Sequence, residues 1–250
     1  MKKAVAFVLA AATTITVSTL SCATDHPYYK DVSSSDWYYQ AVEAVTDDGL
    51  MSGVGNHTFD PSGFVTRAQF VQTLYKKAAG RNAERQVERK FVDVRSSAWY
   101  YDAVMWAAKN GIVVGYDNGK FLPDEYVTRE QMATILYHFD QEIFQPYLEE
   151  LIPKDDNLSE SEESVPEDDA NDFDEPSVTD REKELDRFAD KASVSPYAVE
   201  GLLWATRNSI LNGVSEEVLA PKATATRAEL AQILFSYNQY WNWSIIANVK

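Results

Sequence analysis

The sequence predicts an all-α domain of three helix-loop-helix repeats packed around a pseudo-threefold axis. Two observations predict it: one stretch of sequence recurs in three copies, and each copy contains two segments with apolar residues at helical spacing. A two-helix unit of about fifty residues cannot bury its apolar face alone, so the copies are expected to pack together. With 45% hydrophobic and 12% aromatic residues, the 250-residue chain has enough apolar side chains for such a core.

An export signal is predicted at the start of the chain, over residues 1–23. Lys2 and Lys3 form a positive region, and an apolar stretch of signal-peptide length runs from Ala4 to Val17. Cleavage after Ala23 and lipidation of Cys22, the only cysteine, are the two alternatives for its processing. The apolar run is too short to span a bilayer comfortably, and no later segment qualifies, so no transmembrane span is expected in the mature chain. Either alternative places the protein outside the cytoplasm, at the cell surface or cell wall.

The three copies share one register. A shift of 62 residues places Trp37-Tyr38-Tyr39 on Trp99-Tyr100-Tyr101 without a gap, and a further shift of 98 residues reaches Tyr197 in a more divergent third copy. Because the matches run through loops as well as helices, chance similarity does not explain them. We place the repeats at residues 27–80, 89–141 and 186–241.

The first helix of each copy carries one apolar stripe and ends at a residue suited to positive φ. Gly49 and Gly111 stand at this end in the first two copies, and Ser209 replaces them in the third. The stripe is clearest in the second copy, where Tyr100, Ala103, Val104, Ala107 and Ala108 recur at i, i+3, i+4, i+7 and i+8.

The second helix of each copy opens with a capping box. In this motif the threonine oxygen accepts from the N3 amide, and a Glu or Gln side chain reaches back to the cap amide. The three sequences that fit it are Thr66-Arg67-Ala68-Gln69, Thr128-Arg129-Glu130-Gln131 and Thr226-Arg227-Ala228-Glu229.

These motifs together resemble the S-layer homology (SLH) repeat, whose best-known signature is a Thr-Arg-Ala-Glu-type tetrapeptide. The resemblance implies that three motifs form a helical spindle with the second helices at its centre. It also implies that grooves between neighbouring prongs bind an anionic secondary cell-wall polymer, often carrying a ketal-linked pyruvate. The residues of the second copy that carry the resemblance are Phe91-Val92-Asp93-Val94, Trp99-Tyr100, Gly111-Ile112-Val113-Val114-Gly115, Phe121-Leu122-Pro123 and Thr128-Arg129-Glu130-Gln131.

The motif arginines Arg67, Arg129 and Arg227 are the main candidate ligand-binding residues. Each stands at the first helical position, beside amides expected to be unpaired and at the positive end of the helix dipole, which favours an anion. A guanidinium group also donates two parallel hydrogen bonds to a carboxylate. The alternative is structural, with each arginine bridging repeats to an Asp or Glu. Because the third copy diverges, we rank the grooves of Arg67 and Arg129 before that of Arg227.

Aromatic and glycine residues complete the candidate site. Trp37 and Trp99 either stack on sugar rings or pack into the core as the start of the apolar stripe. Glycines in the loops either let a sugar approach the backbone or serve as turn residues. These glycines are Gly53, Gly115 and Gly213.

An acidic linker, residues 142–185, separates the second repeat from the third, with helical flanks expected at its ends. Between Asp155 and Asp180 it has twelve Asp or Glu and no Lys or Arg, which is typical of a disordered, extended segment. A tether of this length lets the third copy dock on its own chain or on another. Residues 242–250 form a C-terminal tail, and the aromatic side chains around it are expected to pack on the bundle.

The composition and motifs favour a binding protein. A formal charge of −16 argues against a nucleic-acid partner. No nucleophile motif, metal-ligand spacing or phosphate loop is present, so neither an enzyme nor a metal or cofactor site is expected. We predict non-covalent anchoring to the bacterial cell wall through an anionic polysaccharide. The alternative is a surface interaction protein that recruits another protein through its acidic linker or aromatic tail.

Overall fold

The structure is a computed structural model that describes residues 28–83, 88, 90–147 and 183–248. Within these ranges it contains α-helices and short 3-10 and π segments but no β-strand, which confirms the all-α prediction. The predicted export signal, Cys22 and most of the acidic linker lie outside the described residues. The same part of the chain has no helix both long and apolar enough to cross a membrane.

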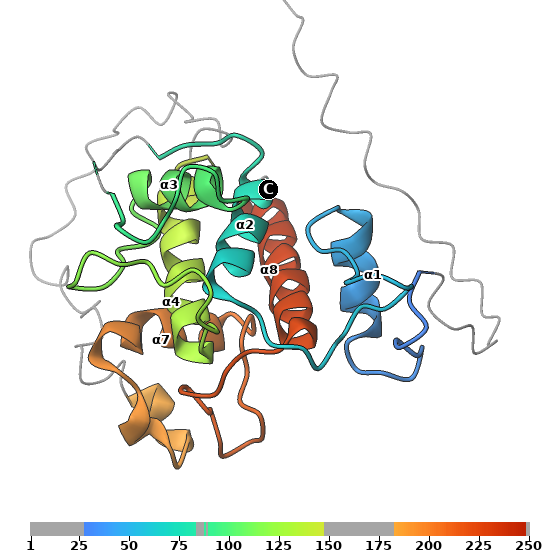
Figure 1. The fold of residues 1–250 in the computed structure, drawn as a ribbon. Coiled ribbons are helices and arrows are strands. Elements are labelled where there is room, and N and C mark those ends of the chain that lie inside the picture. The colour runs from blue at the N-terminus through green and yellow to red at the C-terminus, as the bar shows by residue number, and fades with distance from the viewer. Residues whose placement is uncertain (1–27, 84–87, 89, 148–182, 249–250) are drawn as a thin grey trace, which may run out of the picture.

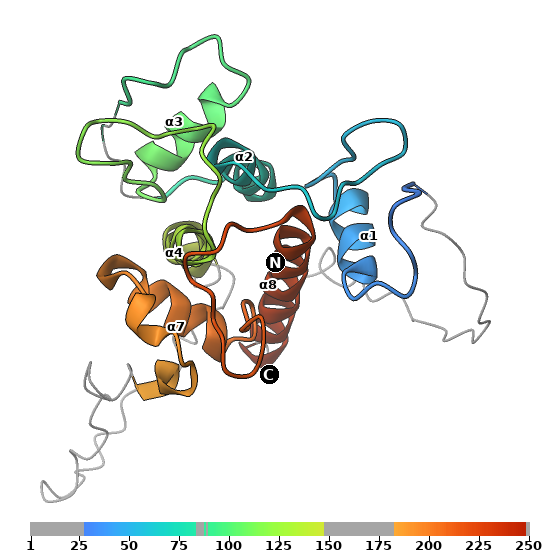
Figure 2. The same ribbon diagram turned by 60° about the horizontal axis from the view of Figure 1, so that its bottom comes forward.

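Each copy contributes one outer and one inner helix. The inner helices lie side by side at the centre of the molecule, and the outer helices lie around them (Figures 1 and 2). The outer helices are α1 (Tyr39–Asp47), α3 (Tyr101–Lys109) and α7 (Val199–Arg207), and the inner helices are α2 (Arg67–Ala78), α4 (Arg129–Phe139) and α8 (Arg227–Asn248). Shorter segments flank the linker and α7: a π-helix, η1 (Asp140–Phe144), and the 3-10 helices η2 (Lys183–Arg187), η3 (Lys191–Ser193) and η4 (Pro196–Ala198).

The helices pair between copies. α3 packs on α2, α7 packs on α4, and α1 packs on α8 (Figure 2). Each outer helix therefore packs on the inner helix of the preceding copy, and we call such a pair a prong. The ring closes because the outer helix of the first copy packs on the inner helix of the third. In the structure of the single chain, the third copy packs on the other two copies of the same chain.

A ring of backbone hydrogen bonds closes the three copies at one end of the inner helices. Val65 N–H donates to the Ala225 carbonyl at 3.0 Å, Ala225 N–H to Val127 at 2.9 Å, and Val127 N–H back to Val65 at 2.9 Å. These residues directly precede the threonine caps. The ring therefore aligns the starts of the three inner helices.

The predicted helix ends are confirmed. The capping boxes of Thr66 and Thr128 are complete, and Thr226 and Glu229 exchange the same two hydrogen bonds at 3.2 and 2.8 Å. At the ends of the outer helices Gly49 and Gly111 have φ of +68° and +75°, and Ser209 takes φ of +54° at the matching position.

A buried carboxylate ties the third copy to α4. The Glu130 side chain accepts hydrogen bonds from Ser195 N–H at 3.0 Å, Tyr197 Oη at 2.8 Å and Lys222 Nζ at 2.6 Å. Burial alone raises the pKa of Glu130, but these hydrogen bonds lower it below its usual value. The corresponding inner-helix residues of the other copies are alanines, so a carboxylate at this position ties only the third copy to its neighbour.

The last inner helix, α8, runs past residue 241, where we place the end of the third repeat. Its Tyr237 and Trp241 are buried, as predicted for the aromatic tail. Their polar atoms both donate to Asp140 Oδ1 at 2.9 Å. Burial raises the pKa of Asp140, and the donors oppose that effect.

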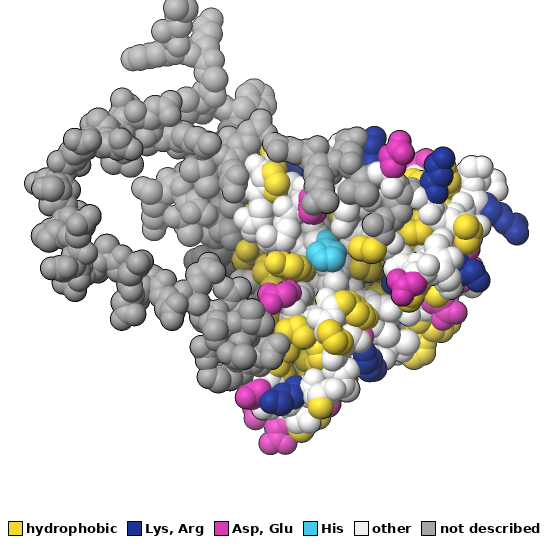
Figure 3. All heavy atoms as spheres, turned by 90° about the vertical axis from the view of Figure 1, so that its left-hand side faces the viewer, with side chains coloured by type: hydrophobic (Ala, Val, Ile, Leu, Met, Phe, Trp, Pro, Cys, Tyr) yellow, Lys and Arg dark blue, Asp and Glu magenta, His cyan; other side chains and the backbone are white. Residues whose placement is uncertain are grey.

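One face of the molecule carries charged side chains of both signs. On the face shown in Figure 3, basic and acidic side chains are interspersed with hydrophobic ones. Neighbouring charges of opposite sign largely cancel at a distance, so long-range electrostatic steering by this face is weak.

Gly201 sets the closest approach of α7 to α4. A Cβ atom at this position would lie 2.7 Å from the Thr134 Cα and 2.9 Å from the Thr134 nitrogen. We therefore expect Gly201→Ala to lower the free energy of unfolding by about 1–3 kcal/mol, because the helices must move apart. Urea unfolding followed by circular dichroism checks this. The exposed neighbour Glu200→Ala is the control, with an expected change within about 0.5 kcal/mol. Equal free energies of unfolding for the Gly201→Ala and Glu200→Ala proteins would contradict the close packing of α7 on α4.

Candidate functional site

The three motif arginines bridge neighbouring copies. In each case Nε donates to a backbone carbonyl in the loop of the next copy around the ring. The acceptors are Phe121 for Arg67 at 2.9 Å, Leu219 for Arg129 at 3.1 Å and Phe59 for Arg227 at 2.7 Å. Each arginine therefore bridges two repeats, but through carbonyls; among the described residues only Arg129 has the carboxylate partner that the structural alternative proposed, Glu229.

The helix-start amides are already paired. Arg67 N–H donates to the Glu125 carbonyl at 2.9 Å, Ala68 N–H to Pro123 at 3.0 Å, and Gln69 N–H to the Thr66 hydroxyl at 3.2 Å. The other two copies repeat this pattern. The prediction that these amides are unpaired is therefore wrong. Because these amides are paired, side-chain cations are the groups left at the helix starts to donate hydrogen bonds to an anion.

A repeated aspartate holds the loop that each arginine contacts. Both Asp93 carboxylate oxygens accept backbone N–H bonds at 2.8 Å, from Phe121 and from Leu122, which has φ of +58°. Asp31 and Asp190 do the same for Phe59-Asp60 and Leu219-Ala220. These aspartates are functional residues that sequence patterns alone did not predict. The signal was their recurrence a few residues before each aromatic motif.

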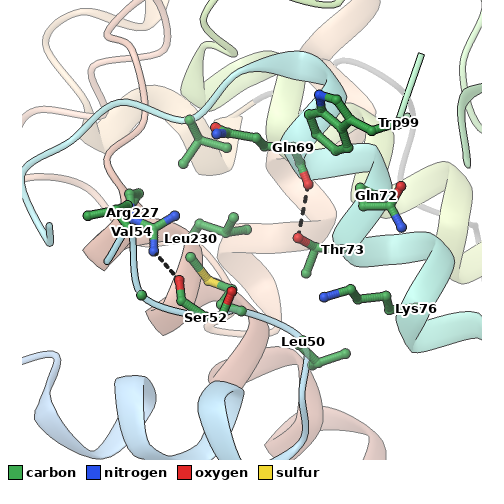
Figure 4. A pocket seen from close by; sticks show the side chains of 13 residues that line it. Leu50, Ser52, Val54, Gln69, Gln72, Thr73, Lys76, Trp99, Arg227 and Leu230 are labelled. Carbon is green, nitrogen blue, oxygen red and sulfur yellow. Dashed lines mark hydrogen bonds between the residues drawn. The ribbon is translucent and has the colours of Figure 1, made fainter. Parts of the chain in front are cut away.

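The first groove lies between the loop 50–54, α2 and Arg227, with a volume of about 260 Å³. Arg227 and Lys76 extend into it from opposite sides, with Thr73 between them and Trp99 at the rim (Figure 4). The loop and helix come from the first copy, Trp99 from the second and Arg227 from the third. The groove thus contains residues of all three repeats.

Two cations face the first groove without a carboxylate in its described lining. Arg227 Nη2 donates to the Ser52 carbonyl at 2.7 Å, and Lys76 Nζ donates to the Gly49 carbonyl at 3.2 Å. Burial lowers the pKa of Arg227, while Asp60 and Asp31 act from farther away to raise it. The first groove therefore carries net positive charge and suits an anion.

The second groove has the same construction but balanced charge. It lies along α8, has a volume of about 740 Å³, and is lined by Trp37 and Arg129. The Arg129 Nη1 atom lies 2.7 Å from Glu229 Oε1, and Nη2 donates to the Asn212 carbonyl at 2.5 Å. Gln69 occupies the position of Glu229 in the first groove, and Ser236 occupies here the position of Lys76.

Arg67 is covered by an aromatic ring. Its guanidinium carbon lies 5.0 Å from the centre of the Tyr116 ring and 4.7 Å from that of Phe121, and the side chain is buried. Tyr116 occupies the position held by Val54 and Val214 in the two open grooves. Arg227 and Arg129 line the two grooves described above, whereas Arg67 lines neither of them; the ranking of the three grooves as ligand sites stays a prediction.

The two tryptophans are surface residues. Trp37 and Trp99 are each 63% exposed and pack edge-on against the following tyrosine at 5.2 Å between ring centroids. This exposure excludes packing of the two rings into the core. Trp99 lines the first groove and Trp37 lines the second.

The loop glycines are required by the protein itself. A Cβ on Gly53 would lie 2.6 Å from the Thr58 carbonyl oxygen and from the Tyr29 ring. Gly115 and Gly213 meet their own loop carbonyls and a buried phenylalanine in the same way. This explains the glycines as turn residues, and a close approach of sugar to them stays a prediction.

A closed ring of three helical repeats with arginine-containing grooves between its prongs defines a repeat-built binding module. The sequence profile of the S-layer homology domain matches residues 28–71, 90–133 and 187–231, one match in each copy. The chain therefore belongs to the S-layer homology domain family.

Known relatives are much longer proteins. The chain is 28% identical over 206 residues to the surface-layer 125 kDa protein of Lysinibacillus sphaericus, covering 81% of this chain and 14% of that protein. It is 27% identical over 207 residues to the exoglucanase XynX of Acetivibrio thermocellus, covering 83% and 16%. A cellulosome-anchoring protein of Acetivibrio thermocellus is 28% identical over 93 residues, or 36% and 21%. The chain spans less than a quarter of each relative.

The aspartate contact gives a stability prediction. Asp93→Ala is expected to lower the free energy of unfolding by about 1.5–3 kcal/mol, because two backbone N–H groups lose a charged acceptor. Urea titration measures it. Asp117→Ala, an exposed aspartate of the same copy, is the control and should change stability by less than about 0.5 kcal/mol. A loss no larger than the control's would show that the carboxylate does not hold the loop.

Proposed function

We propose that this protein attaches to the bacterial cell wall without a covalent bond by binding an anionic wall polysaccharide in the first groove. The observation that carries the proposal is the pair of cations, Arg227 and Lys76, in a cavity without a carboxylate in its described lining. Membership of the S-layer homology domain family supports wall attachment in general.

The chemistry of the first groove favours a sugar that carries a carboxylate. A guanidinium group and an ammonium group both bind a carboxylate through charge-assisted hydrogen bonds. Trp99, at the rim, offers an exposed ring face to the adjoining pyranose. We propose that this acidic group is a ketal-linked pyruvate on the polymer, as the family resemblance implies.

The names of the relatives support a surface location for this chain. They include surface-layer, middle cell wall and cellulosome-anchoring proteins. The matches to an exoglucanase and an endoglucanase cover 16% and 18% of those chains and bring no catalytic assignment to this one. We therefore propose a binding role.

The alternative, recruitment of another surface protein, receives less support. Of the two segments assigned to it, the acidic linker lies largely outside the described residues. The aromatic tail contributes Tyr237 and Trp241 to the core, so these side chains are not free to bind a partner.

The sharpest test changes the groove charge without touching the arginine. Gln69→Glu places a carboxylate where Glu229 pairs with Arg129, and either residue completes the capping box. We expect binding to acidic polymer fragments to weaken by about 10-fold or more, because the new carboxylate pairs with Arg227 and repels the ligand. Isothermal titration with polymer fragments, before and after mild-acid removal of their acidic groups, measures it.

Matched variants separate groove charge from other effects. Gln131→Glu makes the same change beside the covered Arg67 and should leave binding unaltered. Lys76→Ala should weaken binding by about 2- to 5-fold, whereas the exposed Lys109→Ala outside the groove should not. Unchanged binding by a folded Gln69→Glu protein would refute the anion site in the first groove.

A further inference from the structure

The second groove differs from the first in size and in charge. Its volume is about 740 Å³ against about 260 Å³. Its single cation, among the described lining residues, is Arg129, whose side chain is 5% exposed and paired with Glu229. Both Glu229 oxygens are engaged, Oε1 with Arg129 and Oε2 with Thr226 N–H at 2.8 Å.

We propose that the second groove binds an uncharged sugar unit of the wall polymer, with the pyranose ring lying on Trp37. This inference rests on the proposed function, because it assigns the two open grooves to different units of one polymer. The first groove takes the acidic unit, and the second takes a neutral one.

The balanced charge argues against an anion in the second groove. A carboxylate placed beside Arg129 would also approach Glu229, and repulsion from it offsets the attraction. Ser236 stands where Lys76 supplies the second cation of the first groove. Specificity between the grooves therefore comes from a repulsive element as well as from an attractive one.

The lining of the second groove suits a sugar. Trp37 is 63% exposed and forms a T-shaped pair with Tyr38, so most of the indole is accessible to a sugar ring. Gln232, Ser236 and the remaining lone pairs of Glu229 offer hydrogen bonds to hydroxyl groups. Apolar walls with a few polar groups, and a volume within roughly 300–1,000 Å³, are typical of small-ligand sites. The apolar walls are formed by Ile210, Leu211, Val214 and Ile233.

The two tryptophans provide separate reporters for the two grooves. Protein labelled with ¹⁵N-tryptophan gives indole signals for Trp37 and Trp99, assigned by Trp→Phe variants. We expect the acidic polymer fragment to shift both signals and the mild-acid-treated fragment to shift Trp37 alone. No shift of Trp37 with the treated fragment would overturn the proposal. Failure of Trp99 to respond to the acidic fragment would instead count against the proposed function, so the two failures are distinguishable.

Two variants test the chemistry of the second groove. Trp37→Ala, at an exposed position, is expected to weaken binding of the mild-acid-treated fragment by about 3- to 10-fold. Glu229→Gln keeps the capping box, as Gln69 and Gln131 do in the other copies, and unpairs Arg129. In this variant the unpaired Arg129 should bind an acidic group. Free pyruvate should therefore shift the Trp37 signal in the variant but not in the wild type. A shift of Trp37 by pyruvate in the wild type would overturn the assignment of a neutral ligand.

Discussion

The structure depends on one exchange of backbone hydrogen bonds between neighbouring copies. The first two amides of each inner helix donate to carbonyls of the next copy's loop, and the Val65, Val127 and Ala225 ring joins the segments just before them. These amides lack partners within their own helix, so each copy completes the helix start of its neighbour. Three copies close the cycle, and the helix ends stay satisfied only when all three are in place. The arginine–carbonyl and aspartate–amide contacts are built on the same loops.

Charge in the grooves varies independently of this framework. The third residue of each inner helix is Gln69, Gln131 or Glu229, and each side chain reaches back to the cap amide equally well. A capping box accepts either residue type, so the fold places no constraint on the choice. The choice nevertheless decides whether the arginine that faces it from another copy is neutralised, as Arg129 is by Glu229. One side chain at a helix start thus sets the charge of the groove at little cost in stability.

The sequence predicted the repeats, the helix ends and the arginines, because periodicity and capping are local patterns. It did not predict the pairing of each outer helix with the preceding copy, since nothing local distinguishes that partner from the helix of its own copy. The burial of Arg67 under Tyr116 was missed for a similar reason: the two residues lie in different copies. The exposed position of Trp37 and Trp99 also contradicts a stripe-based core assignment, because each residue precedes the helix rather than lying on its buried face.

Each open groove takes residues from all three copies, so the divergent third copy contributes to more than the groove formed by its own loop. Arg227 comes from that copy but serves the first groove, whose loop belongs to the first copy and whose aromatic rim belongs to the second. The second groove likewise takes its loop from the third copy, Arg129 from the second and Trp37 from the first. No copy holds a complete site, so each substitution in the third copy acts on a groove shared with the others. Glu130 of α4 accepts hydrogen bonds from Ser195 and Lys222 and so ties the third copy to the second, and both open grooves take residues from that third copy.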